Sequence, residues 1–311
     1  MESKIKKNFT KGYTLKKVYK YRWFYVMFLP VLVLAGLFYY NPMFGIRFAF
    51  FEYTPFKGPN FVGLVNFKRL FDTPQFWVAF VNTLELSITK LLLNTFIAVV
   101  ISLMLNEILN LKMKKFFQTV IYLPHFLSWV VTASIFSIIL SPNNGFINSI
   151  LMNLGFIDKE IYFLTEKGIW FYVYLIINVW KDTGWSTIIY LATLSGIDPQ
   201  LYEAASIDGA NRWSKIKYIT MPSLASTIII VLILNLAKIM NLFESVFVLY
   251  NPMVYEVADV LQTYTYRQTL STPVPNFGYT TAVGLFRSLV GCVLVLISNY
   301  ASKKVRGRGI I

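Results

Sequence analysis

The sequence predicts an all-α integral membrane protein with six transmembrane helices. Hydrophobic residues make up 56% of the 311 residues, compared with about 45–50% in a soluble domain. The excess lies in six runs of about 20 residues, the length at which an α-helix crosses a bilayer. Backbone groups in hydrocarbon must bond within the protein, which favours helices, and the alternating runs of about 10 residues that are typical of strand barrels are not seen.

The six predicted spans follow one another with no segment between them long enough for a soluble domain. They are Trp23–Met43, Thr83–Leu105, Val120–Leu140, Ile169–Leu194, Leu224–Leu249 and Ala282–Tyr300. We divide the chain into a basic N-terminal segment (1–22), a membrane domain (23–302) and a basic tail (303–311).

The loops between the spans carry weaker signals. Pro and Gly predict turns in Phe44–Asn82. A short surface helix is expected at Phe146–Leu154, and another in the loop that follows the fifth span.

The positive charges are arranged as in a membrane protein rather than in a nucleic-acid-binding protein. Of the 29 Lys and Arg residues, 18 lie in the N-terminal segment, the second and fourth loops and the tail, against seven in the other three loops. The positive-inside rule places the basic group in the cytoplasm, so both termini are expected there, as in a multi-pass protein of a bacterial plasma or inner membrane.

Motifs of catalysis and of metal binding are missing from the sequence. It has no G-x-x-x-x-G-K-[ST], H-E-x-x-H or G-x-S-x-G pattern, which argues against an ATPase, a metalloprotease or an esterase in this chain. Cys292 is the single cysteine and His125 the single histidine, so neither an internal disulfide nor a His-based metal cluster is expected.

Ionisable and amide side chains nevertheless occur inside the predicted spans, where a charge costs about 2.5–3.5 kcal/mol on insertion scales. The candidates are Glu85, Lys90, Asn178, Trp180, Lys181, Asp182, Asn235, Lys238, Asn241, Glu244 and Arg287. Spacings of three residues predict a polar stripe along the fifth span. These side chains suit a translocation path for a solute rich in hydroxyl groups, and the lysines favour an acidic one. The alternative is pairing between helices, for example of Glu85 or Asp182 with a basic residue on a neighbour.

The stretch "YEAASIDGANRWSKIKYITMP" predicts two short helices in the fourth loop, 196–222. Asp198 and Pro199 suit the start of the first helix. Ala204 and Ala205 give one of its faces small side chains, so another surface could approach closely. Gly209 suits a helix stop. A second helix is expected at Arg212–Thr220, ended by Pro222, which would also open the fifth span.

These residues resemble the EAA loop of ABC importer permeases, which forms a coupling helix that docks on an ATPase subunit. The matching positions are Tyr202, Glu203, Ala204, Ala205, Asp208, Gly209, Ala210, Ile219 and Pro222. Two positions depart mildly from the family pattern: Met221 stands where leucine is usual, and Ile216 where aromatics are common.

The resemblance extends over nearly the whole chain. Stretches such as "PMFGIRFAFFEYTPFKG", "WKDTGWSTIIYLATLSGIDPQLYEAASIDGA" and "LFESVFVLYNPMVYEVADVLQTYTYR" are similar to carbohydrate permeases. The subgroup that they resemble is the LplB-like polysaccharide and oligosaccharide permeases, which are related to the maltose permeases. The resemblance implies the type I (MetI-like) permease fold and a sugar cargo.

The resemblance also implies partners: a second homologous permease, two ATPase subunits that use ATP and Mg²⁺, and an extracytoplasmic binding protein. This chain itself is expected to bind no cofactor, metal or nucleic acid. Three alternatives stay open. They are a permease for glycerol phosphate or peptide, a membrane enzyme, and a self-contained secondary carrier, although the sequence shows neither the inverted repeats nor the broken helices of many carriers.

Overall fold

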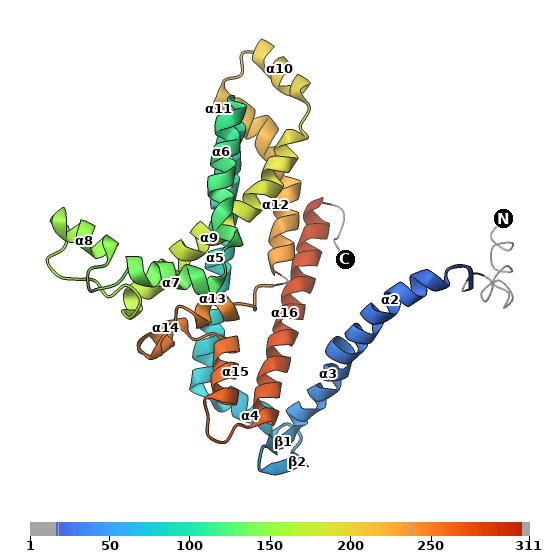
Figure 1. Cartoon of the computed structure of the whole chain (residues 1–311). Helices are drawn as coiled ribbons and strands as arrows, with labels where there is room; N and C mark the ends of the chain where they lie inside the picture. Colours follow the sequence, from blue (N-terminus) through green and yellow to red (C-terminus); the bar gives the residue numbers. More distant parts are fainter. Residues whose placement is uncertain (1–16, 18, 237, 307–311) are drawn as a thin grey trace.

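The computed structural model describes Lys17, residues 19–236 and residues 238–306. Most of the predicted basic segments 1–22 and 303–311 lies outside the described residues. Figure 1 shows long helices side by side, with the short helices α10 and α11 at one end and the strands β1 and β2 at the other.

The first half of the chain contains α2 (Arg22–Ala35), α3 (Asn41–Met43), β1 (Phe51–Thr54), β2 (Lys57–Phe61), α4 (Val65–Asp72), α5 (Pro74–Asn106), α6 (Leu111–Tyr122), α7 (Trp129–Ile139) and α8 (Phe146–Asn153). The second half contains α9 (Lys167–Ser195), α10 (Pro199–Ile207), α11 (Arg212–Lys215), α12 (Met221–Leu236), α13 (Phe243–Phe247), α14 (Tyr255–Ala258), α15 (Leu261–Leu270) and α16 (Phe277–Arg306). Short 3-10 and π turns join several of these helices, among them η3 (Phe44–Phe50), η4 (Leu123–Phe126) and η5 (Ile216–Thr220).

Within the described residues, four helical stretches are long and apolar enough to cross a membrane, or five if one bent pair counts as a single span. They include Arg22–Phe50, Pro74–Asn106 and Phe277–Lys304, which contain the first, second and sixth predicted spans. Helix α2 has no buried side chain and runs away from the other helices (Figure 1).

The predicted fourth span corresponds to α9, which has 29 residues. This helix is not among the apolar stretches, because Asn178, Lys181 and Asp182 lie in its middle and lower its hydropathy. It is instead the most deeply packed of the long helices. Trp170, Tyr174 and Tyr190 on α9 are all at most 1% exposed and pack against α5, α12 and the segment after α12.

The prediction of an unbroken third span, Val120–Leu140, is wrong. The chain bends by 102° between Leu111–Phe126 and Trp129–Ile139. Pro124 has no backbone N–H and lies in a 3-10 turn, and Ser128 then starts a new helix by accepting a hydrogen bond from Val131 N (3.2 Å). The chain therefore contains a broken helix where a continuous span was predicted.

The prediction of a continuous fifth span, Leu224–Leu249, is also wrong. Helix α12 ends at Leu236, and the chain resumes a helix only at α13. The side chain of Gln262 explains how the break is tolerated, because its Oε1 accepts hydrogen bonds from Leu242 N (2.7 Å) and Phe243 N (2.9 Å). Irregular backbone at membrane depth needs such partners or a polar cavity.

The prediction of an all-α chain needs one correction, since β1 and β2 pair as an antiparallel hairpin. Asn66 on α4 fixes the hairpin to the bundle, with its amide donating to Ala49 O (2.9 Å) and Phe51 O (2.8 Å). Helices form at both expected places, at Phe146–Asn153 and in the loop after the fifth span, as α14 and α15. Helix α15 does not lie on the surface, because it packs against α5 and α16 with Leu261, Thr263 and Tyr264 buried.

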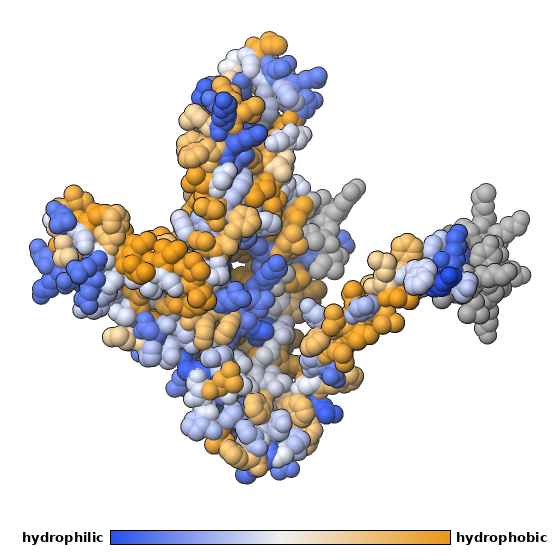
Figure 2. Space-filling view, viewed as in Figure 1, coloured by the Kyte–Doolittle hydropathy of each residue, from blue (hydrophilic) through white to orange (hydrophobic). Residues whose placement is uncertain are grey.

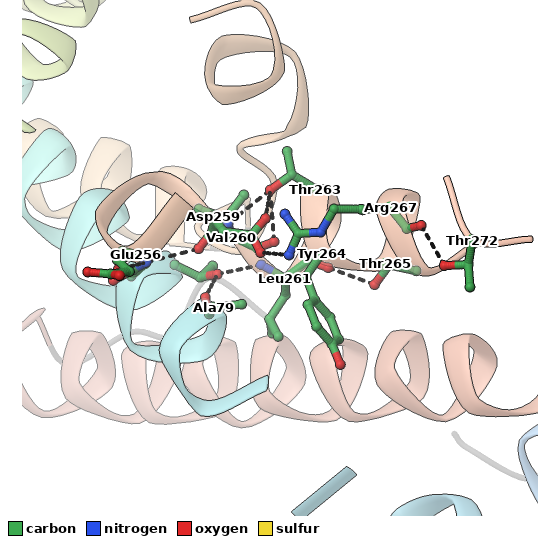
Figure 3. A network of polar contacts seen from close by, with 12 residues as sticks. Ala79, Glu256, Asp259, Val260, Leu261, Thr263, Tyr264, Thr265, Arg267 and Thr272 are labelled. Carbon is green, nitrogen blue, oxygen red and sulfur yellow. Dashed lines mark hydrogen bonds and ion pairs between the residues drawn. The ribbon is translucent and has the colours of Figure 1, made fainter. Parts of the chain in front are cut away.

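A buried polar network holds α14 and α15 against α5 (Figure 3). Asp259 is ion-paired with Arg267 and accepts a hydrogen bond from the Thr263 hydroxyl (2.8 Å). The Thr83 hydroxyl on α5 accepts from Leu261 N (2.8 Å). The segment that follows the break is thus fixed to α5, which defines the position of the chain on that side of the break.

Candidate functional site

A polar cavity of about 460 Å³ lies between α5, α9 and the break that follows α12. Its lining residues are Ser87, Lys90, Leu91, Asn94, Thr95, His125, Asp182, Trp185, Ser186, Asn235, Lys238, Ile239, Asn241 and Leu242. In Figure 2 a hydrophilic hollow is visible in the middle of the face shown, between apolar surfaces. The break in the fifth span thus contributes directly to a cavity inside the bundle.

Five of the predicted path residues line this cavity, namely Lys90, Asp182, Asn235, Lys238 and Asn241. They come together through the break rather than through the continuous polar stripe that the sequence predicted. Arg287 on α16 lies beside the cavity, since its Nη1 is 3.5 Å from Asn241 Oδ1.

The remaining path candidates do not line the cavity. Asn178 is fully buried, and its amide donates to the Tyr174 carbonyl (2.8 Å) within α9. Lys181 is 4% exposed and donates to the His125 carbonyl (3.2 Å). Lys181 thus joins α9 to the turn η4, whereas Asn178 bonds within its own helix.

Trp180, Glu85 and Glu244 are also placed outside the cavity lining. Trp180 packs edge-on against Phe136 of α7, with 5.3 Å between the ring centroids. Glu85 and Glu244 are exposed on the surface of this chain. A single polar residue in a predicted span is therefore a poor guide to the side of the helix that faces the cavity.

Opposite charges meet inside the cavity. Lys90 Nζ lies 3.1 Å from Asp182 Oδ2, and His125 Nδ1 lies 3.8 Å from Asp182 Oδ1. Lys90 and Lys181 both lie over the Trp129 ring, at 5.7 and 5.3 Å from its centroid. The pair neutralises one lysine of the cavity, whereas the side chain of Lys238 forms no hydrogen bond or ion pair among the described residues.

Several lining residues were not among the candidates predicted from the sequence, namely Ser87, Asn94, Thr95, His125, Trp185 and Ser186. Periodicity contains the signal for most of them. Ser87, Lys90, Asn94 and their neighbours recur at three- and four-residue steps, which defines one face of a helix. Trp185 and Ser186 follow Asp182 at the same steps. The rings of His125 and Trp185 stack at 5.1 Å between centroids, forming an aromatic wall.

The 196–222 loop contains the predicted short helix, α10, and the start of the predicted second helix, α11, at one end of the bundle (Figure 1). Asp198 caps α10 by accepting from Gln200 N (3.0 Å). Ala204 is exposed and Ala205 half-buried, and α10 has no buried side chain. Helix α10 therefore presents small side chains at these two positions.

The turn between the two helices depends on a left-handed backbone. Gly209 has φ +77°, and Ala210 N donates to Ala205 O (2.8 Å) to close the end of α10. Asn211 then caps α11 by accepting from Ser214 N (2.8 Å). The predicted helix stop at Gly209 is confirmed, and Asn211 starts the next helix.

Pro222 does not end the second helix, contrary to the prediction. The helix continues from Arg212 through Pro222 to Leu236. The π-turn η5 lies immediately before Met221 and Pro222. Its wider turn leaves room for the proline ring and tolerates the hydrogen bond that proline, without an N–H, cannot donate. The loop is consequently continuous with the helix that leads to the cavity.

A second cavity, of about 280 Å³, lies beneath the loop. It is lined by Glu107, Tyr202, Glu203, Ser206, Arg212, Lys215, Ile216 and Thr220. Among the described residues, no three His, Cys, Asp or Glu side chains are grouped so that they could hold a metal ion.

Comparison with known proteins identifies the family of this chain. Residues 94–307 match the family described as binding-protein-dependent transport system inner membrane component. The polygalacturonan/rhamnogalacturonan transport system permease protein YteP of Bacillus subtilis (strain 168) is 40% identical over 95% of this chain and 92% of its own length. Protein LplB of the same organism is 37% identical over 93% of this chain and 91% of its own length.

A solved structure agrees in both sequence and fold. A chain of a bacterial ABC transporter involved in the import of the acidic polysaccharide alginate superposes with a TM-score of 0.85 and 36% identity, over 94% of this chain and 99% of that one. Our chain therefore belongs to the family of binding-protein-dependent transport system inner membrane components, has the type I permease fold, and is a multi-pass membrane subunit rather than an ATPase.

Proposed function

We propose that this chain is the permease subunit of an ABC importer and forms half of the translocation path for an acidic oligosaccharide or polysaccharide fragment. Two proteins with which it shares 36–40% identity are named for polygalacturonan and rhamnogalacturonan or for alginate. The similarity covers more than nine-tenths of this chain, including the cavity.

The single observation that carries the choice of an acidic cargo is the charge of the cavity. Asp182 is compensated by Lys90, so the cavity keeps Lys238 as a cation that has no counter-charge among the described residues, with Arg287 beside it. Asn235 and Asn241 supply donors and acceptors for hydroxyl groups, and Trp185 supplies an apolar ring face. Carboxylates, hydroxyls and ring faces are the groups that an acidic saccharide presents.

Six crossings with both termini in the cytoplasm remain our preferred topology. Helix α9 has 29 residues, about 43 Å of helix, which is enough for a bilayer. Its Asp182 and Trp185 face the cavity, so they need not face lipid. The bent pair α6–α7 supplies the remaining crossing. The distribution of Lys and Arg supports the orientation.

The 196–222 loop is proposed to be the coupling loop. Its two short helices lie at the end of the bundle that the positive-inside rule assigns to the cytoplasm. The exposed side chains of Leu201 (52%) and Ile207 (88%) leave α10 with an uncovered apolar surface. Such a surface supports docking on an ATPase subunit, whose movement would reach the cavity through α12.

The partners follow from the same proposal. We expect a second, homologous permease, two ATPase subunits that bind ATP and Mg²⁺, and an extracytoplasmic binding protein. One of the similar structures is titled as a complex of the alginate transporter with a periplasmic protein that holds an alginate pentasaccharide. We expect no nucleotide or metal site in this chain.

A self-contained secondary carrier is the less favoured function. The absence of broken helices no longer argues against it, because the structure contains a bend after Phe126 and a break after Leu236. Family membership argues against it instead. A permease for glycerol phosphate or peptide is disfavoured by the polysaccharides for which two similar proteins are named.

The proposal is tested by ATP hydrolysis in the reconstituted complex of this chain with its partners. Binding protein loaded with an acidic oligosaccharide should stimulate hydrolysis more than the same protein offered a neutral oligosaccharide of equal length. Equal stimulation by both, with equal binding to the binding protein, would contradict the acidic cargo.

A further inference from the structure

Helix α10 is held to the rest of the protein by few contacts. It has no buried side chain. Among the described residues, its side chains form hydrogen bonds outside the helix only through Tyr202, which contacts Thr220, and through Ser206, which contacts Lys215. A displacement of α10 therefore reaches the membrane helices through the backbone or through these two contacts.

The inner contact passes through a buried hydroxyl. Thr220 is 3% exposed, and its Oγ1 lies 3.0 Å from the Tyr202 hydroxyl and 3.3 Å from the Lys215 carbonyl oxygen. A threonine hydroxyl has one proton, which the carbonyl accepts, so the Tyr202 hydroxyl is the donor to Thr220. Tyr202 thus donates a hydrogen bond to a residue of the π-turn η5.

The outer contact closes a ring. Lys215 Nζ donates to Ser206 Oγ (2.7 Å), and the Ser206 hydroxyl donates to the Tyr202 carbonyl (2.7 Å). We name Tyr202, Ser206, Lys215 and Thr220 the clamp. Because its outer half is exposed to water, which competes for the same groups, the inner bond between Tyr202 and Thr220 contributes more to rigidity.

The clamp contacts the chain immediately before α12 begins. Thr220 is the last residue of the π-turn, and the helix runs without interruption from there to Leu236. The next turns beyond Leu236 contain Lys238 and Asn241 of the cavity. A rigid helix of 16 residues, α12, therefore connects the clamp with the break that lines the cavity.

We propose that the clamp is the strut through which movement of α10 is passed to α12, with Tyr202 and Thr220 as its positioning residues. The inference rests on the proposed function, since it assumes that the 196–222 loop couples ATP hydrolysis to transport. Without the strut, α10 moves on the flexible turn at Gly209 while α12 stays in place.

The test measures saccharide imported per ATP hydrolysed by the full complex in proteoliposomes. Tyr202→Phe and Thr220→Val each remove one hydroxyl with little change in volume. Each should lower the ratio about fivefold, the factor that corresponds to about 1 kcal/mol, the net contribution of one hydrogen bond. The double variant should be no worse than Thr220→Val alone, because Thr220→Val already removes the bond that Tyr202→Phe removes. Thr220→Ser should retain the wild-type ratio.

Thr227→Val is the matched control. Thr227 also lies on α12 and makes a hydroxyl contact across to another helix, with Thr193 of α9 (3.1 Å), but it does not touch α10. The import ratio of this variant should stay at the wild-type value. A fall equal to that of Thr220→Val would mean that loss of any interhelical hydroxyl has this effect, which overturns the strut.

A second comparison separates the strut from the proposed function. If Gly209→Pro uncouples hydrolysis from import while Tyr202→Phe and Thr220→Val keep the wild-type ratio, the strut is wrong and the coupling loop stands. If Gly209→Pro also keeps the wild-type ratio, the coupling loop itself is wrong, and the strut is overturned with it.

Discussion

The ammonium group of Lys90 lies 3.1 Å from a carboxylate oxygen of Asp182, joining α5 to α9 inside the cavity. Both side chains are about three-quarters buried, at 21% and 26% exposed. The pair is therefore screened less than a surface pair, and removing one partner leaves a charge without compensation.

Asp182→Asn should destabilise the protein, because Lys90 then loses its counter-charge in a partly buried site. We expect a loss of about 1–3 kcal/mol in the free energy of unfolding, measured by thermal unfolding in detergent. Replacing both residues, as Lys90→Met with Asp182→Leu, should recover part of the loss. The exposed pair of Lys167 with Glu256 is the control, and Glu256→Gln should leave the unfolding temperature nearly unchanged. Equal effects of Asp182→Asn and Glu256→Gln would contradict the role of burial.

Lys238→Gln should weaken uptake of an acidic oligosaccharide and leave uptake of a neutral one nearly unchanged. Lys238 lines the cavity and has no counter-charge among the described residues. Initial uptake rates in proteoliposomes would measure the difference, which we expect to be about tenfold, or 1.4 kcal/mol. Lys238→Arg should keep the preference. Glu244→Gln, at an exposed position of α13 just after the break, is the matched control and should not alter it.

Gly184→Ala should disturb the contact of α9 with the bent pair α6–α7. An added Cβ at Gly184 would lie 2.3 Å from the backbone oxygen of Ile121, so one helix must shift. We expect a loss of about 1–3 kcal/mol, typical of overpacking, seen as a lower unfolding temperature. Gly168→Ala is the control, since it lies on the same helix with nothing within 4 Å of its Cβ. A lower unfolding temperature for Gly168→Ala than for Gly184→Ala would contradict this packing.

Gly209→Ala should strain the turn of the 196–222 loop, because φ +77° is unfavourable for a residue with a Cβ. The expected cost is about 1–2 kcal/mol locally, and import per ATP should fall while the chain still inserts. Gly45→Ala is the control, since Gly45 has equally open surroundings but an ordinary φ. Glu203→Lys, which reverses a charge on α10 without strain, should also lower the ratio if an ATPase docks on this surface. A wild-type ratio in both loop variants would be the contradicting result.

Much of the helical framework is predictable from the sequence, because runs of apolar residues report burial in lipid or protein directly. The ends of α5, α9 and α16 extend the predicted spans by a few residues or turns. The two interruptions were not predicted, although Pro124 with Ser128 is a local signal for the first. The second depends on Gln262, which is distant in sequence and caps Leu242 and Phe243.

The candidate site is predictable in part for the same reason. The loop 196–222 follows from short-range rules, since Asp198, Gly209 and Asn211 act on neighbouring residues. The cavity depends on which helix faces meet. Lys181 and Asp182 are adjacent in sequence, yet one is buried in a helix contact and the other lines the cavity. Residue type alone does not distinguish these two positions.

The most direct measurement of the central claim is saccharide uptake by proteoliposomes that contain this chain, its second permease and the ATPase subunits, with loaded binding protein outside. We predict uptake that requires ATP, ceases when the ATPase subunits are omitted, and favours an acidic oligosaccharide over a neutral one of equal length. Uptake that continues at the same rate without the ATPase subunits would contradict the claim that this chain is the permease of an ABC importer.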